Sequence, residues 1–160
     1  APLEALLEAR SRGVLFDVGH GVGAFAWRVA EPACQKFGFW PDTISTDIHH
    51  FNLHGPVFDM PTTMSKFLYL GMPLESVIQA STSVPAAAMG LQDRIGTLKV
   101  GMQSDIVLLK HERGNFPLVD VEQQTRISPE RLAAVKVCKR GRWVDCDPTS
   151  VTGERMNRSS

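Results

Sequence analysis

The sequence has no long hydrophobic run and no excess of either charge. Its 17 Lys and Arg residues balance 17 Asp and Glu residues, so the formal net charge is zero. This balance argues against the basic surface of a nucleic-acid-binding protein and against a polybasic membrane patch. No apolar stretch approaches the roughly 20 residues that span a bilayer, and the first residues lack the pattern of a secretory signal peptide. We therefore expect a cytoplasmic protein with no nucleic-acid partner and no membrane partner.

Cysteine is scarce as well. Cys34, Cys138 and Cys146 form an odd and widely spaced set. They make neither a disulfide framework nor the paired spacing of a cysteine metal site. We expect three reduced thiols, as is usual in the cytoplasm.

The chain is also short for one fold class that its motifs indicate. Its 160 residues are enough for one domain with its own core. A complete (β/α)8 barrel takes roughly 250 residues, so the chain cannot contain one.

Two strand-end motifs carry most of the information. The runs Phe16–Gly21 and Ile44–His49 each begin with apolar or β-branched residues, reach a titratable residue and continue into a glycine-rich or polar loop. Residues 24–37 between them have a helical composition, in which Pro32 is expected either in a first turn or at a kink. In (β/α) barrels the catalytic residues lie at the C-terminal ends of parallel strands. This layout places His20 and Asp47 at such ends.

The remaining elements divide the chain near Leu91. Before it, residues 62–70, 74–81 and 85–90 are expected to be helical, with Thr62 or Thr63 as the first cap. After it, strands are expected at residues 106–109, 116–121 and 135–144, the last with a turn at 139–141.

These patterns predict three parts of the chain. Residues 1–91 are expected to form βα units, and residues 92–146 are expected to form an all-β part. Residues 147–160 are polar and without periodicity, so we expect a disordered tail there.

Four segments resemble a known family. Glu8–Gly21, Gly38–Asp47 and Met64–Leu68 resemble barrel segments of the amidohydrolase superfamily, within which they are most similar to dihydroorotase-like, deacetylase-type enzymes. Ile95–Val107 is similar to the segment where such chains return to a small β-sandwich domain. The resemblance implies an α/β fold: the C-terminal part of a TIM (β/α)8 barrel followed by part of a small β-sandwich.

The resemblance also implies roles for individual residues. Asp47 matches the family's aspartate at the eighth strand, which is a metal ligand and the proton shuttle. His20 matches a histidine that faces the substrate, and His49 lies close enough to Asp47 to be a second substrate contact. Two divalent metal ions, most simply zinc, are implied for the intact enzyme. Their remaining ligands would lie upstream of Ala1.

The function implied is metal-dependent hydrolysis of the acyl C–N or ester bond of a small molecule. Metal-bound water supplies hydroxide near neutral pH. A carboxylate such as Asp47 can then act as the general base and pass the proton to the leaving group. This chain alone is expected to bind no stoichiometric metal and to hydrolyse nothing.

Two other functions remain open. The first is a catalytically inactive fragment that acts as an interaction or assembly module, because part of a barrel exposes open parallel strand edges. Both the enzyme hypothesis and the assembly-module hypothesis predict that the chain associates, either as a homo-oligomer or with the N-terminal part of the barrel. The second is a binding protein that kept the fold and lost the chemistry.

Each singled-out residue also has a structural interpretation. Asp47 could cap a helix or brace a loop, and His20 could be a loop histidine bonded to backbone. His50 and His54 have the i, i+4 spacing of helical zinc ligands, but the glycine and proline that follow disfavour a helix there. Lys66 is expected to keep its charged end in solvent.

Overall fold

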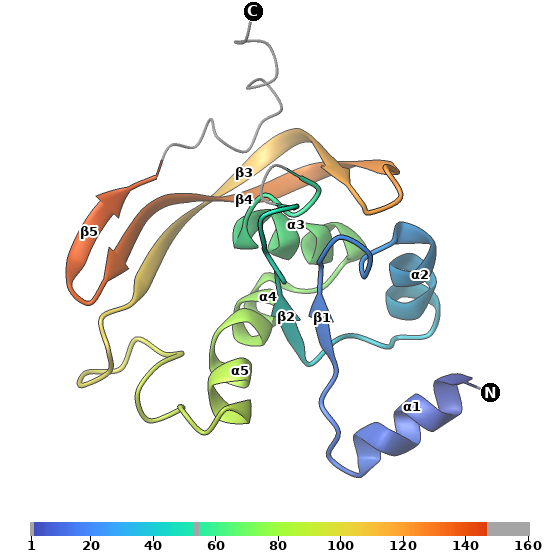
Figure 1. The fold of residues 1–160 in the computed structure, drawn as a ribbon, viewed down its shortest axis with the longest axis horizontal. Helices are drawn as coiled ribbons and strands as arrows, with labels where there is room; N and C mark the ends of the chain where they lie inside the picture. The colour runs from blue at the N-terminus through green and yellow to red at the C-terminus, as the bar shows by residue number, and fades with distance from the viewer. Residues whose placement is uncertain (1, 53–54, 147–160) are drawn as a thin grey trace, which may run out of the picture.

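The computed structural model describes residues 2–52 and 55–146 (Figure 1). Helices and short strands alternate in its first half, and a long antiparallel hairpin forms its second half. The elements of the first half are α1 (Pro2–Ser11), β1 (Asp17–Gly19), α2 (Trp27–Glu31), the π-helical turn η1 (Pro32–Lys36), β2 (Thr43–Ser45), α3 (Met60–Leu70), α4 (Leu74–Ser81) and α5 (Ser83–Ala88). Those of the second half are β3 (Ile106–Val119), β4 (Thr125–Lys139) and β5 (Arg142–Asp145).

The two short strands pair in parallel, with Asp17 opposite Thr43 and Gly19 opposite Ser45. Helix α2 and turn η1 make the connection between them. The change from α2 to η1 falls at Pro32, because proline cannot donate the backbone hydrogen bond that a regular α-helix would need there. The predicted strand, helix and parallel strand are therefore confirmed, with Pro32 in the first turn of η1.

Helix α3 begins earlier than its sequence suggested. Its N-cap is Asp59, whose side chain accepts a hydrogen bond from the backbone N–H of Thr62, so the predicted cap at Thr62 or Thr63 is wrong. An N-cap carboxylate satisfies one of the free N–H groups of the first turn. The helix ends as predicted at Gly71, whose φ of +101° suits glycine.

Helix α1 is joined to the strands by one arginine. Nη2 of Arg10 donates to the backbone oxygen of Trp40 at 2.6 Å and to Oδ2 of Asp42 at 3.0 Å. The same Asp42 oxygen accepts the backbone N–H of Phe16 at 2.8 Å. The guanidinium also lies 4.2 Å from the centre of the Phe39 ring. These contacts hold the last turn of α1 against the segments that lead into both strands.

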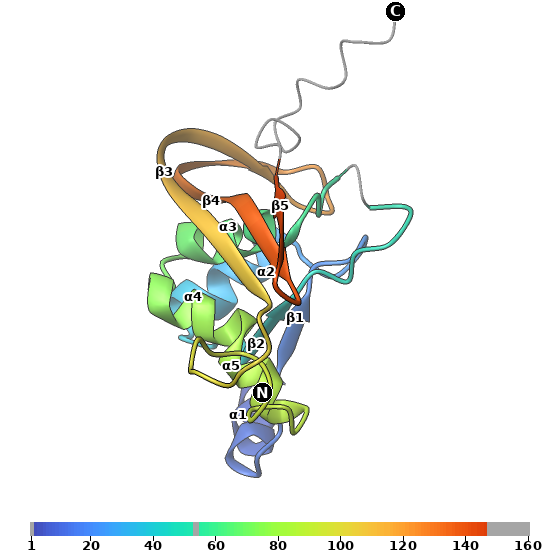
Figure 2. The ribbon, with the colours of Figure 1, turned by 90° about the vertical axis from the view of Figure 1, so that its left-hand side faces the viewer.

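Strands β3 and β4 form one long curved hairpin that arches over α3 (Figures 1 and 2). The two strands predicted at 106–109 and 116–121 are a single strand in the structure, and β4 begins ten residues before the predicted 135. Irregular register between Leu108 and Leu109 and between Arg113 and Phe116 breaks the alternation of side chains, which explains the misplaced bounds. The predicted turn at 139–141 is confirmed, with positive φ at Arg140 and Gly141.

One hydrophobic core joins the two halves. Buried side chains from the first half pack with Leu118 of β3 and Leu132 of β4 in one cluster that includes Phe25, Trp27 and Phe67. Residues 92–146 thus share the core of residues 1–91, and their standing as a separate domain remains a prediction.

The part after Leu91 has the expected all-β character. Its strands β3, β4 and β5 form one antiparallel sheet, and the only other sheet in the described residues is the parallel pair of β1 and β2. Several apolar side chains of this sheet are exposed, namely Val107, Leu108, Ile127, Val135, Trp143 and Val144. A sandwich therefore stays an expectation for this sheet.

Three further predictions concern smaller features. All three cysteines are free thiols, and Cys34 and Cys138 are buried. No helix in the part of the chain that the structure describes is long and apolar enough to cross a membrane. The tail predicted at 147–160 lies outside the described residues.

Candidate functional site

One face of the parallel strand pair is polar. Oγ1 of Thr43 donates to Oδ1 of Asp17 at 2.7 Å, and Oγ of Ser45 donates to Oδ2 of Asp17 at 2.6 Å. Side chains alternate along a strand, so Ile44 points the other way and is 2% exposed in the core. Sequence analysis missed this cluster. The alternation of Thr43, Ser45 and Asp47 with apolar or β-branched neighbours was the signal that could have revealed it.

Asp47 continues this alternation two residues beyond β2. Its backbone has a φ of +47°, a left-handed conformation that non-glycine residues adopt only when neighbouring contacts hold it. Those contacts come from Asn52, a fully buried side chain. Nδ2 of Asn52 donates to the backbone oxygen of Asp47 at 2.9 Å, and Oδ1 accepts the backbone N–H of His49 at 2.7 Å. The loop thus fixes Asp47 and His49 relative to each other, and both are exposed.

The loop after β1 forms the neighbouring wall. The backbone N–H of His20 donates to the Ser45 oxygen at 3.2 Å, and that of Gly21 donates to the Thr46 oxygen at 3.1 Å. The two strand ends therefore lie side by side, as the motifs predicted. A Cβ atom on Gly21, whose φ is +52°, would lie 2.8 Å from Oδ2 of Asp47. Glycine suits this positive φ, and its lack of a side chain leaves room for the carboxylate in its observed position.

His20 does not reach the polar face. Its side chain is fully buried and stacks on Phe25, with ring centres 5.1 Å apart. Nδ1 lies 3.0 Å from the Gly21 backbone oxygen, and Nε2 is hydrogen-bonded to Nζ of Lys66. Burial, and next the charge of Lys66, lower the pKa of His20 to about 4. The ring is therefore neutral at pH 7, and both of its nitrogens are engaged.

Lys66 is the partner that sequence analysis placed in solvent, and that prediction is wrong. Its side chain is 0% exposed. Nζ donates to the backbone oxygens of Pro56 at 3.1 Å and Val119 at 2.6 Å. Burial lowers the pKa of Lys66 to about 7, and the negative charge of Asp120 acts in the opposite direction. The helical pattern of residues 62–70 predicted the helix, but it did not predict how deeply Lys66 is buried.

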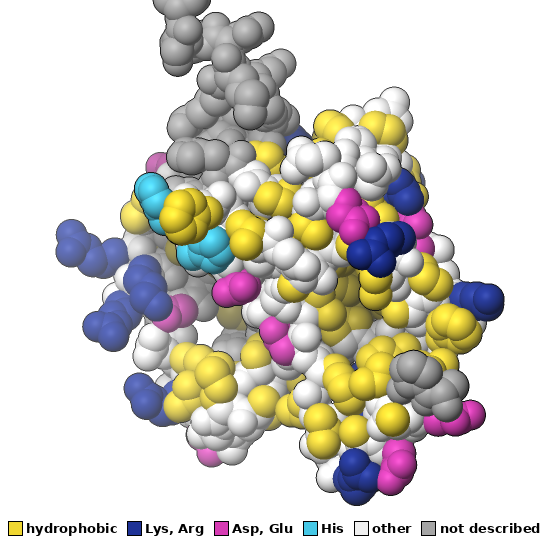
Figure 3. All heavy atoms as spheres, turned by 45° about the vertical axis from the view of Figure 1, so that its right-hand side comes forward, with side chains coloured by type: hydrophobic (Ala, Val, Ile, Leu, Met, Phe, Trp, Pro, Cys, Tyr) yellow, Lys and Arg dark blue, Asp and Glu magenta, His cyan; other side chains and the backbone are white. Residues whose placement is uncertain are grey.

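The histidines after Asp47 lie on an exposed loop. Nδ1 of His49 accepts the backbone N–H of Phe51 at 3.3 Å, and the Phe51 side chain is 82% exposed. His50 is also exposed, and His54 lies outside the described residues. Figure 3 shows histidine side chains at the edge of a face that also carries acidic groups and hydrophobic surface.

These residues do not make a complete metal centre. Over residues 2–52 and 55–146, no three His, Cys, Asp or Glu side chains gather closely enough to hold a metal ion. A protein zinc site uses at least three such ligands. Asp47 can supply one ligand, so a metal at this position needs further ligands from residues outside the described part.

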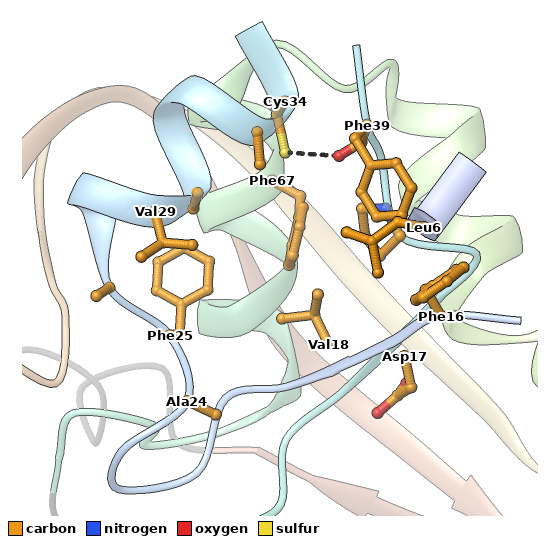
Figure 4. A pocket seen from close by; sticks show the side chains of 14 residues that line it. Leu6, Phe16, Asp17, Val18, Ala24, Phe25, Val29, Cys34, Phe39 and Phe67 are labelled. Carbon is orange, nitrogen blue, oxygen red and sulfur yellow. Dashed lines mark hydrogen bonds between the residues drawn. The ribbon is translucent and has the colours of Figure 1, made fainter. Parts of the chain in front are cut away.

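A separate cavity lies on the apolar side of β1 (Figure 4). It has a volume of about 260 Å³ and lies between α1, β1 and the α2–η1 helix. Most of its lining is apolar, including Leu6, Phe16, Val18, Val29 and Phe67. It lacks the convergent polar groups that catalysis requires, so it is not the candidate active site.

Comparisons with known proteins agree on one family. The model of the Amidohydrolase family matches residues 27–146. A deacetylase from Enterococcus faecalis is 34% identical over 86% of this chain and 37% of its own length. The chain therefore spans little more than a third of this curated relative.

Solved structures give the same picture. The crystal structure of an adenine deaminase is similar with a TM-score of 0.81 and 33% identity, over 88% of this chain and 38% of that one. The crystal structure of a dihydroorotase is similar with a TM-score of 0.78 and 30% identity, over 90% of this chain and 38% of that one.

We expect Gly21→Ala to displace Asp47 or to destabilise the loop, because the new Cβ meets Oδ2 and alanine disfavours the positive φ. A loss of about 1–2 kcal/mol in the free energy of unfolding is expected. Gly23→Ala is the matched control, since nothing lies within 4 Å of its Cβ position and its φ is not positive. Urea denaturation of both variants measures the difference, and equal stabilities would contradict the close approach.

We also expect acid to destabilise the fold through His20. Folding lowers its pKa from 6.5 to about 4. Between these pH values the imidazole is therefore protonated in the unfolded chain and neutral in the folded chain. The free energy of unfolding should therefore fall by about 3 kcal/mol as the pH drops from about 6.5 to 4. Urea titrations across this range measure the slope. His20→Gln should flatten it, whereas His111→Gln on the exposed sheet should keep it. The same slope in all three proteins would show that His20 is not the group responsible.

Proposed function

This chain belongs to the amidohydrolase family, and on that premise we propose that it is part of a hydrolase for the acyl C–N or ester bond of a small molecule. The similarity to a deacetylase and to a dihydroorotase supports this reaction class. The observation that carries the proposal is Asp47, an exposed carboxylate held in a left-handed conformation at the end of a parallel strand. Such strand ends are where barrel enzymes place their catalytic groups.

Asp47 is the proposed general base and a metal ligand. Its carboxylate takes a proton from the attacking water and delivers it to the leaving nitrogen or oxygen. A divalent metal, zinc by preference, would supply an activated water. Because the described residues hold no complete ligand set, the other ligands are proposed to come from the upstream part of the same barrel.

The histidines take different proposed roles. His49 is exposed and fixed to the Asp47 loop through Asn52, which suits a direct contact with substrate. His20 was expected to face the substrate, but its ring is buried and both nitrogens are engaged. We therefore propose that His20 acts on the site through the loop that it supports.

The proposed partner is a neighbouring set of βα units, either from the same enzyme or from a second copy of this chain. Within the described residues, β1 and β2 each pair with one strand only, which leaves an edge of each open. Leu6 and Val29 are exposed and line the apolar cavity beside β1. An added strand and helix would cover this surface and pair with the open edge.

The catalytic proposal is tested by Asp47→Asn in the full-length protein that contains this chain. Loss of the base should lower kcat on a panel of N-acetylated amino acids and cyclic amides by about a hundredfold or more. Asp145→Asn is the control, because Asp145 lies on β5 with an 85% exposed side chain. Undiminished turnover in Asp47→Asn would refute the assignment. In parallel, metal analysis of the 160-residue chain alone should find less than one ion per chain.

The partner proposal predicts self-association of the 160-residue chain on its own. Light scattering should give a mass above the 17.6 kDa of one chain, because association buries the exposed apolar surface beside β1. Val29→Glu, at the cavity, should lower that mass. Leu98→Glu should not, since Leu98 lies in the segment between α5 and β3 and is already 81% exposed. A monomeric unmodified chain would rule out a second copy as the partner and leave only the upstream βα units of the same enzyme.

A further inference from the structure

The fully buried Lys66 lies beneath the candidate site. It belongs to α3, yet the three partners of Nζ come from three other segments: His20 after β1, Pro56 before α3 and Val119 at the end of β3. An ammonium group has three N–H donors and no acceptor. The three partners match these donors one to one, which makes burial of the charge tolerable.

Further groups around the ammonium favour its charge. The centre of the Phe25 ring lies 5.4 Å from Nζ, and the same ring stacks on His20. Asp120 is fully buried and favours the positive charge of Lys66. The carboxylate of Asp120 is itself held by the backbone N–H groups of Trp27, Glu122 and Gln124.

The ammonium selects one form of the His20 ring. A donor at Nε2 requires that Nε2 accept, so the ring proton must lie on Nδ1. Nδ1 faces the carbonyl oxygen of Gly21 at 3.0 Å, and a carbonyl can only accept. The tautomer with the proton on Nδ1 satisfies both contacts. In the opposite tautomer, the Nε2–H donor would face the N–H donors of Nζ, and the Nδ1 acceptor would face the Gly21 oxygen, which is also an acceptor.

The His20 tautomer is linked to Asp47 through a single residue, Gly21. The Gly21 carbonyl is held by the His20 ring, and the Gly21 N–H is held by the Thr46 oxygen at 3.1 Å. The same glycine leaves the space that Oδ2 of Asp47 fills. The position of Gly21 therefore limits the space that the Asp47 carboxylate can occupy on that side.

We propose that Lys66 is a positioning residue, which fixes the Nδ1–H tautomer of His20 and thereby holds the Gly21 backbone against Asp47. The importance of this arrangement for hydrolysis rests on the proposed function. The arrangement itself does not, because it is a property of the chain without metal or substrate.

The test uses nuclear magnetic resonance of the ¹⁵N-histidine-labelled chain at pH 6, which lies between the pKa of His20 at about 4 and that of Lys66 at about 7, so that the ring is neutral and the lysine is charged. His20 is assigned by its loss in His20→Gln. The unmodified chain should show His20 with its proton on Nδ1. In Lys66→Met, Nε2 loses its donor, and the ring should shift toward the Nε2–H form or a mixture. Leu68→Ala is the matched control: it destabilises the same helix from the buried core and should leave the tautomer unchanged.

Hydrogen exchange gives the second readout. The reference is the N–H of Val77 in α4, which donates to the Pro73 oxygen. The exchange rate of the Gly21 N–H, divided by that of Val77, should rise about tenfold from the unmodified chain to Lys66→Met. In Leu68→Ala the ratio of the two should stay the same, because a general loss of stability affects both.

Two results would overturn the proposal. One is an Nε2–H tautomer of His20 in the unmodified chain, which needs no variant and so decides the matter even if Lys66→Met does not fold. The other is an unchanged tautomer and an unchanged exchange ratio in folded Lys66→Met. Because neither readout involves turnover, an inactive enzyme could still pass this test and an active one could fail it.

Discussion

The ammonium group of Lys66 connects more of this molecule than any other polar atom described above. It lies in the core, where an unpaired charge would cost far more free energy than a domain of this size has to spare. Its three acceptors come from three different segments, two of them about fifty residues away in the sequence, so each must be in place before the charge is satisfied. The loops around the candidate site are thus fixed from below, by an interaction that solvent does not screen.

The hairpin takes part in the same arrangement. Val119 at the end of β3 supplies one acceptor for Lys66, and the next residue, Asp120, receives the backbone N–H that begins α2. Helix α2 has no side-chain cap of its own, so a carboxylate 93 residues away performs that task. The sheet is in this way part of the structure that orders the βα half, in addition to sharing its core.

The sequence predicted those features that depend on neighbours along the chain. The parallel strand ends, the place of Pro32 in a first helical turn, the stop at Gly71 and the bounds of α4 each follow from local residue types, and the structure has them. Features that depend on contacts across the chain were not accessible. The depth of Lys66, the cap from Asp120 and the continuity of β3 through its irregular register arise from packing, which no local pattern reports.

The same distinction applies to the candidate site. The motif placed Asp47 at a strand end, but not the buried amide of Asn52 that maintains its unusual backbone. An asparagine five residues after an aspartate is too common a pattern to indicate a clamp. The polar cluster of Asp17, Thr43 and Ser45 was detectable in principle, since alternation along a strand is a local pattern.

The attachment of α1 has a consequence for protein engineering. Its contacts through Arg10 are concentrated in the last turn, next to the segments that enter both strands. A linker, a tag or a complementing fragment joined at the first residues of α1 would attach about two helical turns away from these contacts. This distance makes it a natural junction for rebuilding a larger protein from separately produced pieces.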